Sequence, residues 1–321
     1  MTDPDANYGL LELRNGGGPR AVVVLHGIRQ TREDLREFAL MIGDWLPPAY
    51  GLYLYGYNHT AGLEYNGTKL RDALDAEVAA ERIDVVGYSM GGLVARLAAS
   101  QSWPSRIHTV VTVATPNRGS ISNAELTALG QVGRSIFQMI SPLAPRTEGV
   151  KDLTRVIPIM RGLRERLKGQ LAGGRSTAAE RRYASIPALF YNEDRTEFEF
   201  GPSVALSGAQ ALIRLTGLRL KLVNMKKAHD GIVTESSNRL SGSDSTDFTE
   251  VHLTRAAADG NPALCHAVVD TCLLQDHSSI LSDANVAHLV AGLLLNDDWR
   301  KVRQSDPDLD ASARLYPFDS A

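Results

Sequence analysis

The chain has 321 residues and a formal charge of −3, from 34 Lys plus Arg against 37 Asp plus Glu. With 43% hydrophobic and 22% charged residues, it has the composition of a globular protein that can bury a large core without disulfides or metals. This balance excludes the strongly basic composition typical of nucleic-acid-binding proteins, and we expect no nucleic-acid partner.

Short apolar runs alternate with helical patterns through the first third of the chain. Strands are expected at 21–25, 52–57, 83–86 and 107–113, and helices at 31–46, 68–81 and 91–100. Continuous β-branched runs such as 21–25 are typical of strands that are buried on both faces. Strands that alternate with helices predict βαβ units, so the fold class is α/β, with a mostly parallel sheet and helices on both faces.

The alternation stops after Ala114. Residues 120–183 contain no convincing strand, and apolar residues recur at helical spacing between 153 and 167, with Pro158 dividing that helix. We therefore expect one domain over 1–321 with a helical cap inserted at 120–183. Further on, we expect strands at 186–191, 218–222 and 248–253, a short helix near 203–217 and a closing helix at 286–295.

The segment Gly87-Tyr88-Ser89-Met90-Gly91 follows an expected strand and opens an expected helix. It matches G-x-S-x-G, the nucleophile elbow, in which a serine on a strained turn projects its hydroxyl from the carboxyl edge of a sheet. Side chains at positions 87 and 91 would collide with the neighbouring strand and helix, which explains both glycines. Ser89 is therefore the candidate nucleophile.

An acyl-transfer site also needs two N–H donors for the oxyanion. One candidate is the Met90 amide at the start of the helix, where the helix dipole favours negative charge. The other is the Ile28 amide, in the loop after the strand at 21–25, where Gly27 allows the backbone to approach closely. We interpret His26 as a structural residue that orients this loop, not as the catalytic base.

A serine hydroxyl needs a base, and the base needs an acid that orients it. Among eight histidines, His277 lies in a polar loop between the last strand and the closing helix, and the chain order Ser, acid, His favours it. Two acids compete. Asp194 directly follows the strand expected at 186–191, as simple topology requires, whereas Asp230 lies in an Asp-Gly turn that can present a carboxylate inward.

These segments together resemble the α/β-hydrolase lipases and esterases, in particular bacterial true lipases and the inositol-deacylase-like group. The shared motifs are His26-Gly27, Gly87 to Gly92, 114–120, Asp230-Gly231-Ile232-Val233 and His277. The resemblance implies a lid inserted after Ala114 and places the catalytic acid at Asp230, with Asp194 as the runner-up. Two positions depart from it: Asn117 stands where such sequences often have His, and Asp276 where they have Asn.

The resemblance implies a serine hydrolase of carboxylic esters that forms an acyl-enzyme and needs no cofactor. Some bacterial lipases hold a structural calcium near the acid and base loops, but no ligand set in this sequence requires one. The same triad could serve a thioesterase, an amidase or an acyltransferase, and a catalytically silent binding module is a further alternative. The substrate would be a small-molecule or lipid ester. Residues 146–182 contain ten Lys or Arg and four Asp or Glu, a net of +6, so this cap could rest transiently on a lipid surface.

The beginning of the sequence has neither a basic region nor an apolar run typical of a signal peptide, and no apolar run approaches the ~20 residues of a membrane-spanning helix. The expectation is a cytoplasmic protein. Cys265 and Cys272, seven residues apart, are expected as buried apolar residues on one helix face and not as a disulfide or zinc pair.

Overall fold

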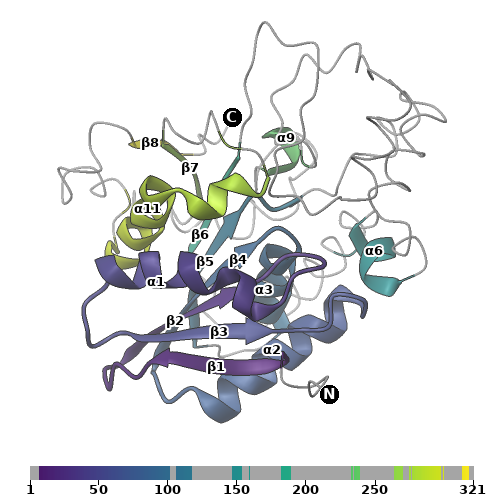
Figure 1. Ribbon diagram of the computed structural model, residues 1–321, viewed down its shortest axis with the longest axis horizontal. Coiled ribbons are helices and arrows are strands. Elements are labelled where there is room, and N and C mark those ends of the chain that lie inside the picture. Colours follow the sequence, from purple (N-terminus) through teal and green to yellow (C-terminus); the bar gives the residue numbers. More distant parts are fainter. Residues whose placement is uncertain are drawn as a thin grey trace, which may run out of the picture.

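A single twisted sheet organises the chain (Figure 1). The computed structural model describes residues 7–101, 106–117, 147–153, 159, 182–188, 233, 235–238, 264–269, 275, 277–297, 299 and 313–317. The strands are β1 Gly9–Arg14, β2 Arg20–Leu25, β3 Gly51–Gly56, β4 Arg82–Tyr88, β5 Ile107–Val113, β6 Arg182–Ile186, β7 Leu264–Val269 and β8 Ala313–Pro317. Their order is β1-β3-β2-β4-β5-β6-β7-β8. Strands β2 to β7 are parallel, while β1 and β8 pair antiparallel at the two edges.

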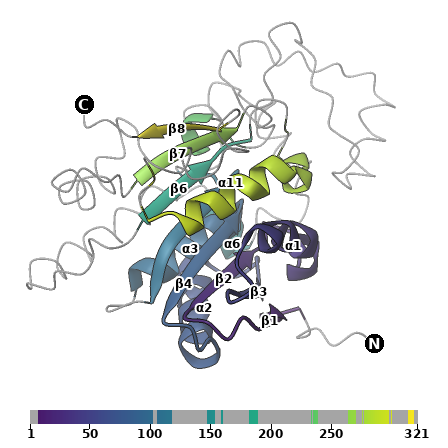
Figure 2. The same ribbon diagram turned by 90° about the vertical axis from the view of Figure 1, so that its left-hand side faces the viewer.

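Helices cover both faces of this sheet, as the alternating sequence pattern predicts (Figure 2). The main helices are α1 Arg36–Trp45, α2 Leu63–Glu77, α3 Met90–Gln101 and α11 Ala284–Leu295. Helices α1 and α11 pack together on one face, and α2 and α3 on the other. Alternate residues of each strand face the two helix pairs, so Val86 joins the α1/α11 core and Val85 the α2/α3 core. The prediction of a mostly parallel α/β sheet is confirmed.

Several elements differ from the sequence-based expectation. Strand β6 covers Arg182–Ile186 and not 186–191, because the charged residue at its start keeps its guanidinium bonded at the sheet edge while Tyr183 and Ile186 are buried. The edge strands β1 and β8 were not predicted, nor was β7. Cys265 and His266 lie on β7, so the helix expected around them is wrong, and Cys272 lies outside the described residues.

Of the segment expected as a cap, 120–183, the structure describes 147–153, residue 159 and the last two residues. Helix α6 spans Glu148–Leu153, and the Asp152 carboxylate accepts a hydrogen bond of 2.8 Å from the Leu63 N–H at the start of α2. Arg182 and Tyr183, at the end of the expected segment, belong to strand β6. Most of 120–183, and the elements expected at 203–217, 218–222 and 248–253, lie outside the described residues. No helix among the described residues is long and apolar enough to cross a membrane.

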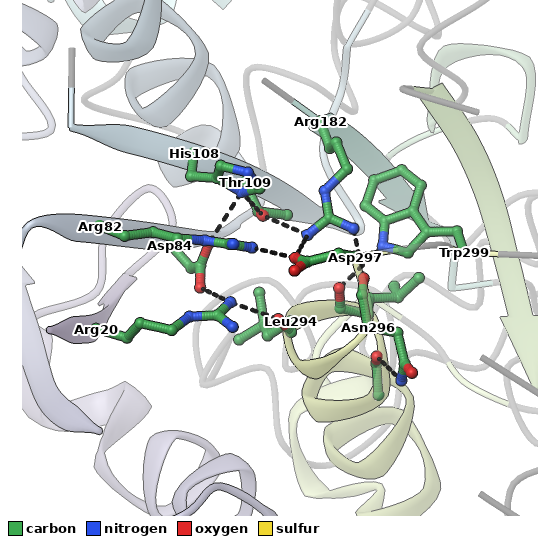
Figure 3. Close-up of polar contacts among 12 residues, drawn as sticks. Arg20, Arg82, Asp84, His108, Thr109, Arg182, Leu294, Asn296, Asp297 and Trp299 are labelled. Atoms are coloured by element: carbon green, nitrogen blue, oxygen red, sulfur yellow. Dashed lines mark hydrogen bonds and ion pairs between the residues drawn. The ribbon is translucent and has the colours of Figure 1, made fainter. Parts of the chain in front are cut away.

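The amino edge of the parallel sheet holds a cluster of ionic side chains (Figure 3). Asp84, fully buried on β4, accepts a 2.9 Å hydrogen bond from Arg20 and lies 3.8 Å from the Arg82 Nε. Arg82 and Arg182 both reach the Asp297 carboxylate, at 2.8 and 3.3 Å. We call these five residues the amino-edge ion cluster.

The amino-edge ion cluster also holds the end of α11. Arg20 donates to the Leu294 carbonyl at 2.7 Å, and Arg182 donates to the Asn296 carbonyl. These carbonyls belong to the last turn and the C-cap of the helix. Carbonyl groups at these positions receive no hydrogen bond from an N–H group within the helix itself. The two guanidinium groups therefore satisfy the helix end and complement its negative dipole.

Candidate active site

The nucleophile elbow has the strained geometry that the motif requires. Ser89 has φ of 51°, and its N–H donates to the Val113 carbonyl at 2.9 Å. A Cβ at Gly87 would lie 2.4 Å from the Gly92 backbone, and one at Gly91 would lie 2.5 Å from the His26 carbonyl oxygen. The two glycines thus let helix α3 begin directly against β4 and β2, which leaves the serine at the carboxyl edge of the sheet.

The loop after β2 is held by a reciprocal contact between His26 and Tyr57. The Tyr57 N–H donates to His26 Nε2 at 3.1 Å, the Tyr57 hydroxyl donates to the His26 carbonyl at 2.8 Å, and the two rings stack at 4.3 Å. With Nε2 as acceptor, Nδ1 carries the proton and donates to the Gly27 carbonyl at 2.8 Å. Burial lowers the pKa of His26 to about 4, so the ring is neutral at neutral pH. His26 therefore acts as a structural residue in the geometry of this loop.

The two amides expected to bind the oxyanion come from different elements. Met90 is the first residue of α3, directly after Ser89, and Ile28 lies in the loop after β2. Within the described part of the chain neither N–H has a hydrogen-bond acceptor, whereas the neighbouring Gly27 N–H donates to the Gln30 side chain at 2.8 Å. Two N–H groups without an internal acceptor, one of them at a helix start, fit the donors that an oxyanion needs.

His277 lies beside the nucleophile. Its Nε2 is 2.9 Å from the Ser89 Oγ, although the two residues are 188 positions apart in the sequence. Both side chains are buried, with 6% of Ser89 and 7% of His277 exposed. With Nε2 unprotonated, the hydroxyl donates to the imidazole, which is the arrangement that activates a serine.

A hydrogen bond joins the residues that flank the segment of His277. Gln275 donates to the Asp283 carboxylate at 3.1 Å, and Asp283 caps α11 by accepting the Asn285 N–H at 2.8 Å. A 3-10 turn, Ser279–Ser282, lies between them and buries Ile280. The start of α11 thus fixes the loop in front of it.

Both candidate acids, Asp230 and Asp194, lie outside the described residues, as does Asp276. The acid assignment therefore stays a prediction. Shortly after Asp230 in the chain, Val233 is buried and a short helix, α9 Glu235–Asn238, is described.

Asn117, the first departure from the family pattern, joins three elements around α3. Its side-chain N–H groups donate to the Asn238 carbonyl of α9 at 2.6 Å and to the Thr112 hydroxyl at 3.1 Å. Its Oδ1 accepts from the Arg96 guanidinium at 3.1 Å, as does its backbone carbonyl. Burial lowers the pKa of Arg96 to about 10, so this buried group still carries its charge at neutral pH. An amide at 117 supplies both the acceptor and the donors.

Two further histidines, His288 and His108, have partners away from Ser89. His288 stacks on Trp45 at 3.7 Å between α11 and α1, and His108 lies at the amino edge 3.8 Å from Asp84. Burial, with the nearby charge of Arg82, lowers the pKa of His108 to about 3, so that contact is not an ion pair at neutral pH. Among the residues that the structure describes, no three His, Cys, Asp or Glu side chains gather to hold a metal.

Sequence reasoning missed the contacts of Tyr57, Gln30, Asp283 and Tyr88 around these loops. Only Tyr88 carried a signal, because it is the residue of the elbow motif that directly precedes the nucleophile. The contacts of Gln30 and Asp283 are local in sequence, three and eight residues from their partners, whereas the Tyr57–His26 contact spans 31 positions; the structure reveals all three.

Several solved structures are similar to this chain at low sequence identity. The chain is 17% identical to the mature lipase of Bacillus licheniformis, with a TM-score of 0.48 over 89% of this chain and 98% of that one. It is 19% identical to a metagenomic carboxyl esterase, with a TM-score of 0.39 over 69% and 60% of the two chains. It is 16% identical to a thioesterase domain of the nocardicin cluster, with a TM-score of 0.32 over 58% and 78%. No curated protein matches.

The sheet of six parallel strands, the left-handed serine between β4 and α3, and the histidine before α11 make up the α/β-hydrolase fold. Residues 9–172, just over half of the chain, match a family described as "Domain of unknown function (DUF7379)". The chain belongs to this DUF7379 family, and its fold is that of the α/β-hydrolases.

Proposed function

We propose that this chain is a serine hydrolase of carboxylic esters, a lipase or esterase that works through an acyl-enzyme. One observation carries the proposal: the 2.9 Å contact between Ser89 Oγ and His277 Nε2 at the carboxyl edge of the sheet. The left-handed backbone conformation of Ser89 costs free energy, and backbone strain of this kind clusters at functional sites.

In the proposed reaction, Ser89 Oγ attacks the acyl carbon while His277 Nε2 accepts its proton. The amides of Ile28 and Met90 stabilise the oxyanion of the tetrahedral intermediate. His277 then gives the proton to the leaving alcohol, and water releases the acid from the acyl-enzyme by the same route. Asp230, by the family resemblance, holds the imidazole in the tautomer that leaves Nε2 free.

Labelling with a fluorophosphonate probe tests the nucleophile. We expect the wild type to be labelled and Ser89→Ala to be unlabelled. Ser100→Ala is the matched control, because Ser100 is another buried serine of α3, whose hydroxyl bonds only to backbone carbonyls in the described structure. Absence of labelling in the folded wild type would contradict the enzyme and favour a silent binding module on this fold.

The acid is tested by a matched pair of variants. Asp230→Asn is expected to lower kcat by a factor on the order of 10⁴, because a triad that loses its acid loses the correct histidine tautomer. Asp194→Asn is expected to leave kcat close to the wild-type value. The reverse result would assign the acid to Asp194.

The substrate class is tested with nitrophenyl esters from acetate to palmitate. Preference for long chains in emulsified form would mark a lipase, and preference for acetate or butyrate an esterase. Thioester or amide substrates turned over faster than every ester would contradict the ester assignment.

We further propose that the basic cap gates access to Ser89 and contacts a lipid surface. A deletion that tests the proposal should keep Arg182, which lies on β6 at the amino edge, and Asp152, whose carboxylate binds the start of α2. A deletion of 155–180 spares both residues. It should reduce activity on long-chain esters more than on short-chain esters, and an equal loss on both would refute the gating role.

A further inference from the structure

The alternation of strand β4 determines what the residue before the nucleophile can touch. Side chains of successive strand residues point to opposite faces, so Tyr88 shares the α1/α11 face with Val86. The loop that carries His277 leads into α11 on that same face, and its Ile280 lies in the same core cluster. A long side chain at position 88 therefore extends toward the histidine loop.

Tyr88 makes this contact with its hydroxyl. The phenol donates a hydrogen bond of 2.5 Å to the carbonyl oxygen of His277, and the two rings lie 5.2 Å apart with a tilt of 43°. The tyrosine is 3% exposed, so water does not compete freely for this carbonyl.

The same ring also contacts the oxyanion loop. A Cβ built on Gly27 would lie 2.9 Å from Tyr88 Cε1 and 3.0 Å from Ser89 Cβ. Residue 27 has to be glycine here because the tyrosine ring occupies the space of a side chain. Tyr88 is therefore in contact with the loop of Ile28 on one side and the loop of His277 on the other.

These contacts form a closed circuit. From Ser89 the circuit passes through the peptide bond to Tyr88, through its hydroxyl to the His277 carbonyl, through the imidazole and back to Ser89 Oγ. A ring with two hydrogen bonds fixes the distance between nucleophile and base more closely than the loop alone. Opening the Tyr88 bond breaks this circuit and removes a hydrogen bond from the backbone of His277.

We propose that Tyr88 is a positioning residue. Its hydroxyl binds the backbone carbonyl of His277 and so holds the imidazole in hydrogen-bond geometry beside Ser89, while the ring of Tyr88 supports the oxyanion loop. This inference rests on the proposed hydrolase function and deepens it. In this role Tyr88 acts through the backbone of His277, so its effect is expected in kcat and not in substrate binding.

The test is Tyr88→Phe, which removes one oxygen and keeps the ring. Because a misplacement of about 1 Å can cost a factor of about 10², we expect kcat on a short-chain nitrophenyl ester to fall by about tenfold to a hundredfold with KM unchanged. Fluorophosphonate labelling should slow by a similar factor. All rates are referred to the folded fraction from near-ultraviolet circular dichroism.

Tyr53→Phe is the matched control, because the Tyr53 hydroxyl bonds to Glu12 on the exposed edge of the sheet. It should leave both kcat and KM at wild-type values. A rescue variant carries p-aminophenylalanine at position 88, which places an N–H donor where the hydroxyl was. Its kcat should lie within about threefold of the wild type, as a restored neutral hydrogen bond implies.

Three results would overturn the inference: an unchanged kcat in the folded Tyr88→Phe variant, a loss confined to KM, or no rescue by the amino variant. If Tyr88→Phe does not fold, the rescue variant decides alone, because a folded chain with kcat at least tenfold below wild type contradicts the role of the donor. A wild type that neither hydrolyses esters nor reacts with the probe contradicts the proposed function itself. The two failures are therefore distinguishable.

Discussion

At the carboxyl edge of the sheet, Ser89 and His277 form a hydrogen-bonded pair, and the backbone of Ser89 is held in the left-handed region. At the amino edge of the same strands, the amino-edge ion cluster joins three arginines to two aspartates and closes the end of α11. Strands β2 and β4 run from one set of residues to the other.

The two edges differ in what their polar groups achieve. The amino edge pairs buried charge with opposite charge and with helix carbonyls, so the loss of one partner is expected to destabilise the fold. At the carboxyl edge, by contrast, the polar groups are a hydroxyl, an imidazole and two backbone amides, which lie beside the ends of the parallel strands. In this chain, stability and proposed chemistry are thus assigned to opposite ends of one sheet, and separate variants can test each end.

The largest effect is expected at the carboxyl edge. His277→Ala removes the proposed base, and kcat should fall by a factor on the order of 10⁴ to 10⁶. The free energy of unfolding should change little, because the Tyr88 contact is made to the backbone of residue 277. Ester hydrolysis and urea unfolding measure the two quantities. A large loss of stability with preserved kcat would invert the comparison.

The next effect is expected at the amino edge. Asp84→Ala leaves the guanidinium groups of Arg20 and Arg82 beside an empty buried site, and removal of one partner from a buried ion pair costs about 3–5 kcal/mol. The free energy of unfolding should fall by that amount, while kcat of the folded fraction stays at the wild-type value.

Asp297 supplies the control for this variant, because its side chain is 72% exposed although it reaches Arg82 and Arg182. Asp297→Ala should cost less than about 1 kcal/mol, as is typical of exposed ion pairs. Equal losses in both variants would show that the burial of Asp84 is not what makes the amino edge stabilising.

A smaller effect is expected at Asn117, where both the free energy of unfolding and kcat can change. Asn117→Ala removes an acceptor from Arg96 and a donor from the Asn238 carbonyl, and unsatisfied buried polar groups cost about 1–3 kcal/mol. If α9 helps to hold the segment of the proposed acid Asp230, kcat should fall as well. Asn117→His, the residue of the family pattern, should retain more activity than alanine. Unfolding and hydrolysis of both variants provide the measurement.

The last prediction compares the pH dependence that one histidine at each edge contributes. Burial lowers the pKa of His26 to about 4 and that of His108 to about 3, so the unfolded chain binds more protons than the folded chain as pH falls below 6.5. The free energy of unfolding should therefore be fully present above pH 6.5. Each histidine should lower it by up to about 1.4 kcal/mol per pH unit as the pH falls toward 4.

Unfolding midpoints of wild type, His26→Asn and His108→Asn between pH 7 and pH 4.5 measure this dependence. Each variant should show a shallower fall in stability than the wild type. A steeper fall in either variant would mean that the histidine is charged in the folded chain.

The sequence alone predicts those elements and site residues that depend on a local sequence pattern. The strand, turn and helix around Ser89 could be predicted from the G-x-S-x-G pattern. The glycines at 87 and 91 mark positions where neighbouring backbone leaves no space for a side chain. The parallel sheet followed from continuous apolar strands between amphipathic helices. His277 could be chosen among eight histidines by its place in the chain order, and His26 could be assigned to the loop after the first parallel strand.

Tertiary structure decided what depends on partners distant in sequence. Strand β6 begins with Arg182, which no pattern of apolar residues would predict, because its charge is met by Asp297 and the end of α11. Edge strand β1 forms by pairing with β3. Likewise, the link from Tyr88 to the His277 carbonyl joins residues 189 positions apart. Sequence determines which residues can react; the pairing of distant strands and loops determines which of them meet, because hydrogen bonds need both partners within about 3 Å.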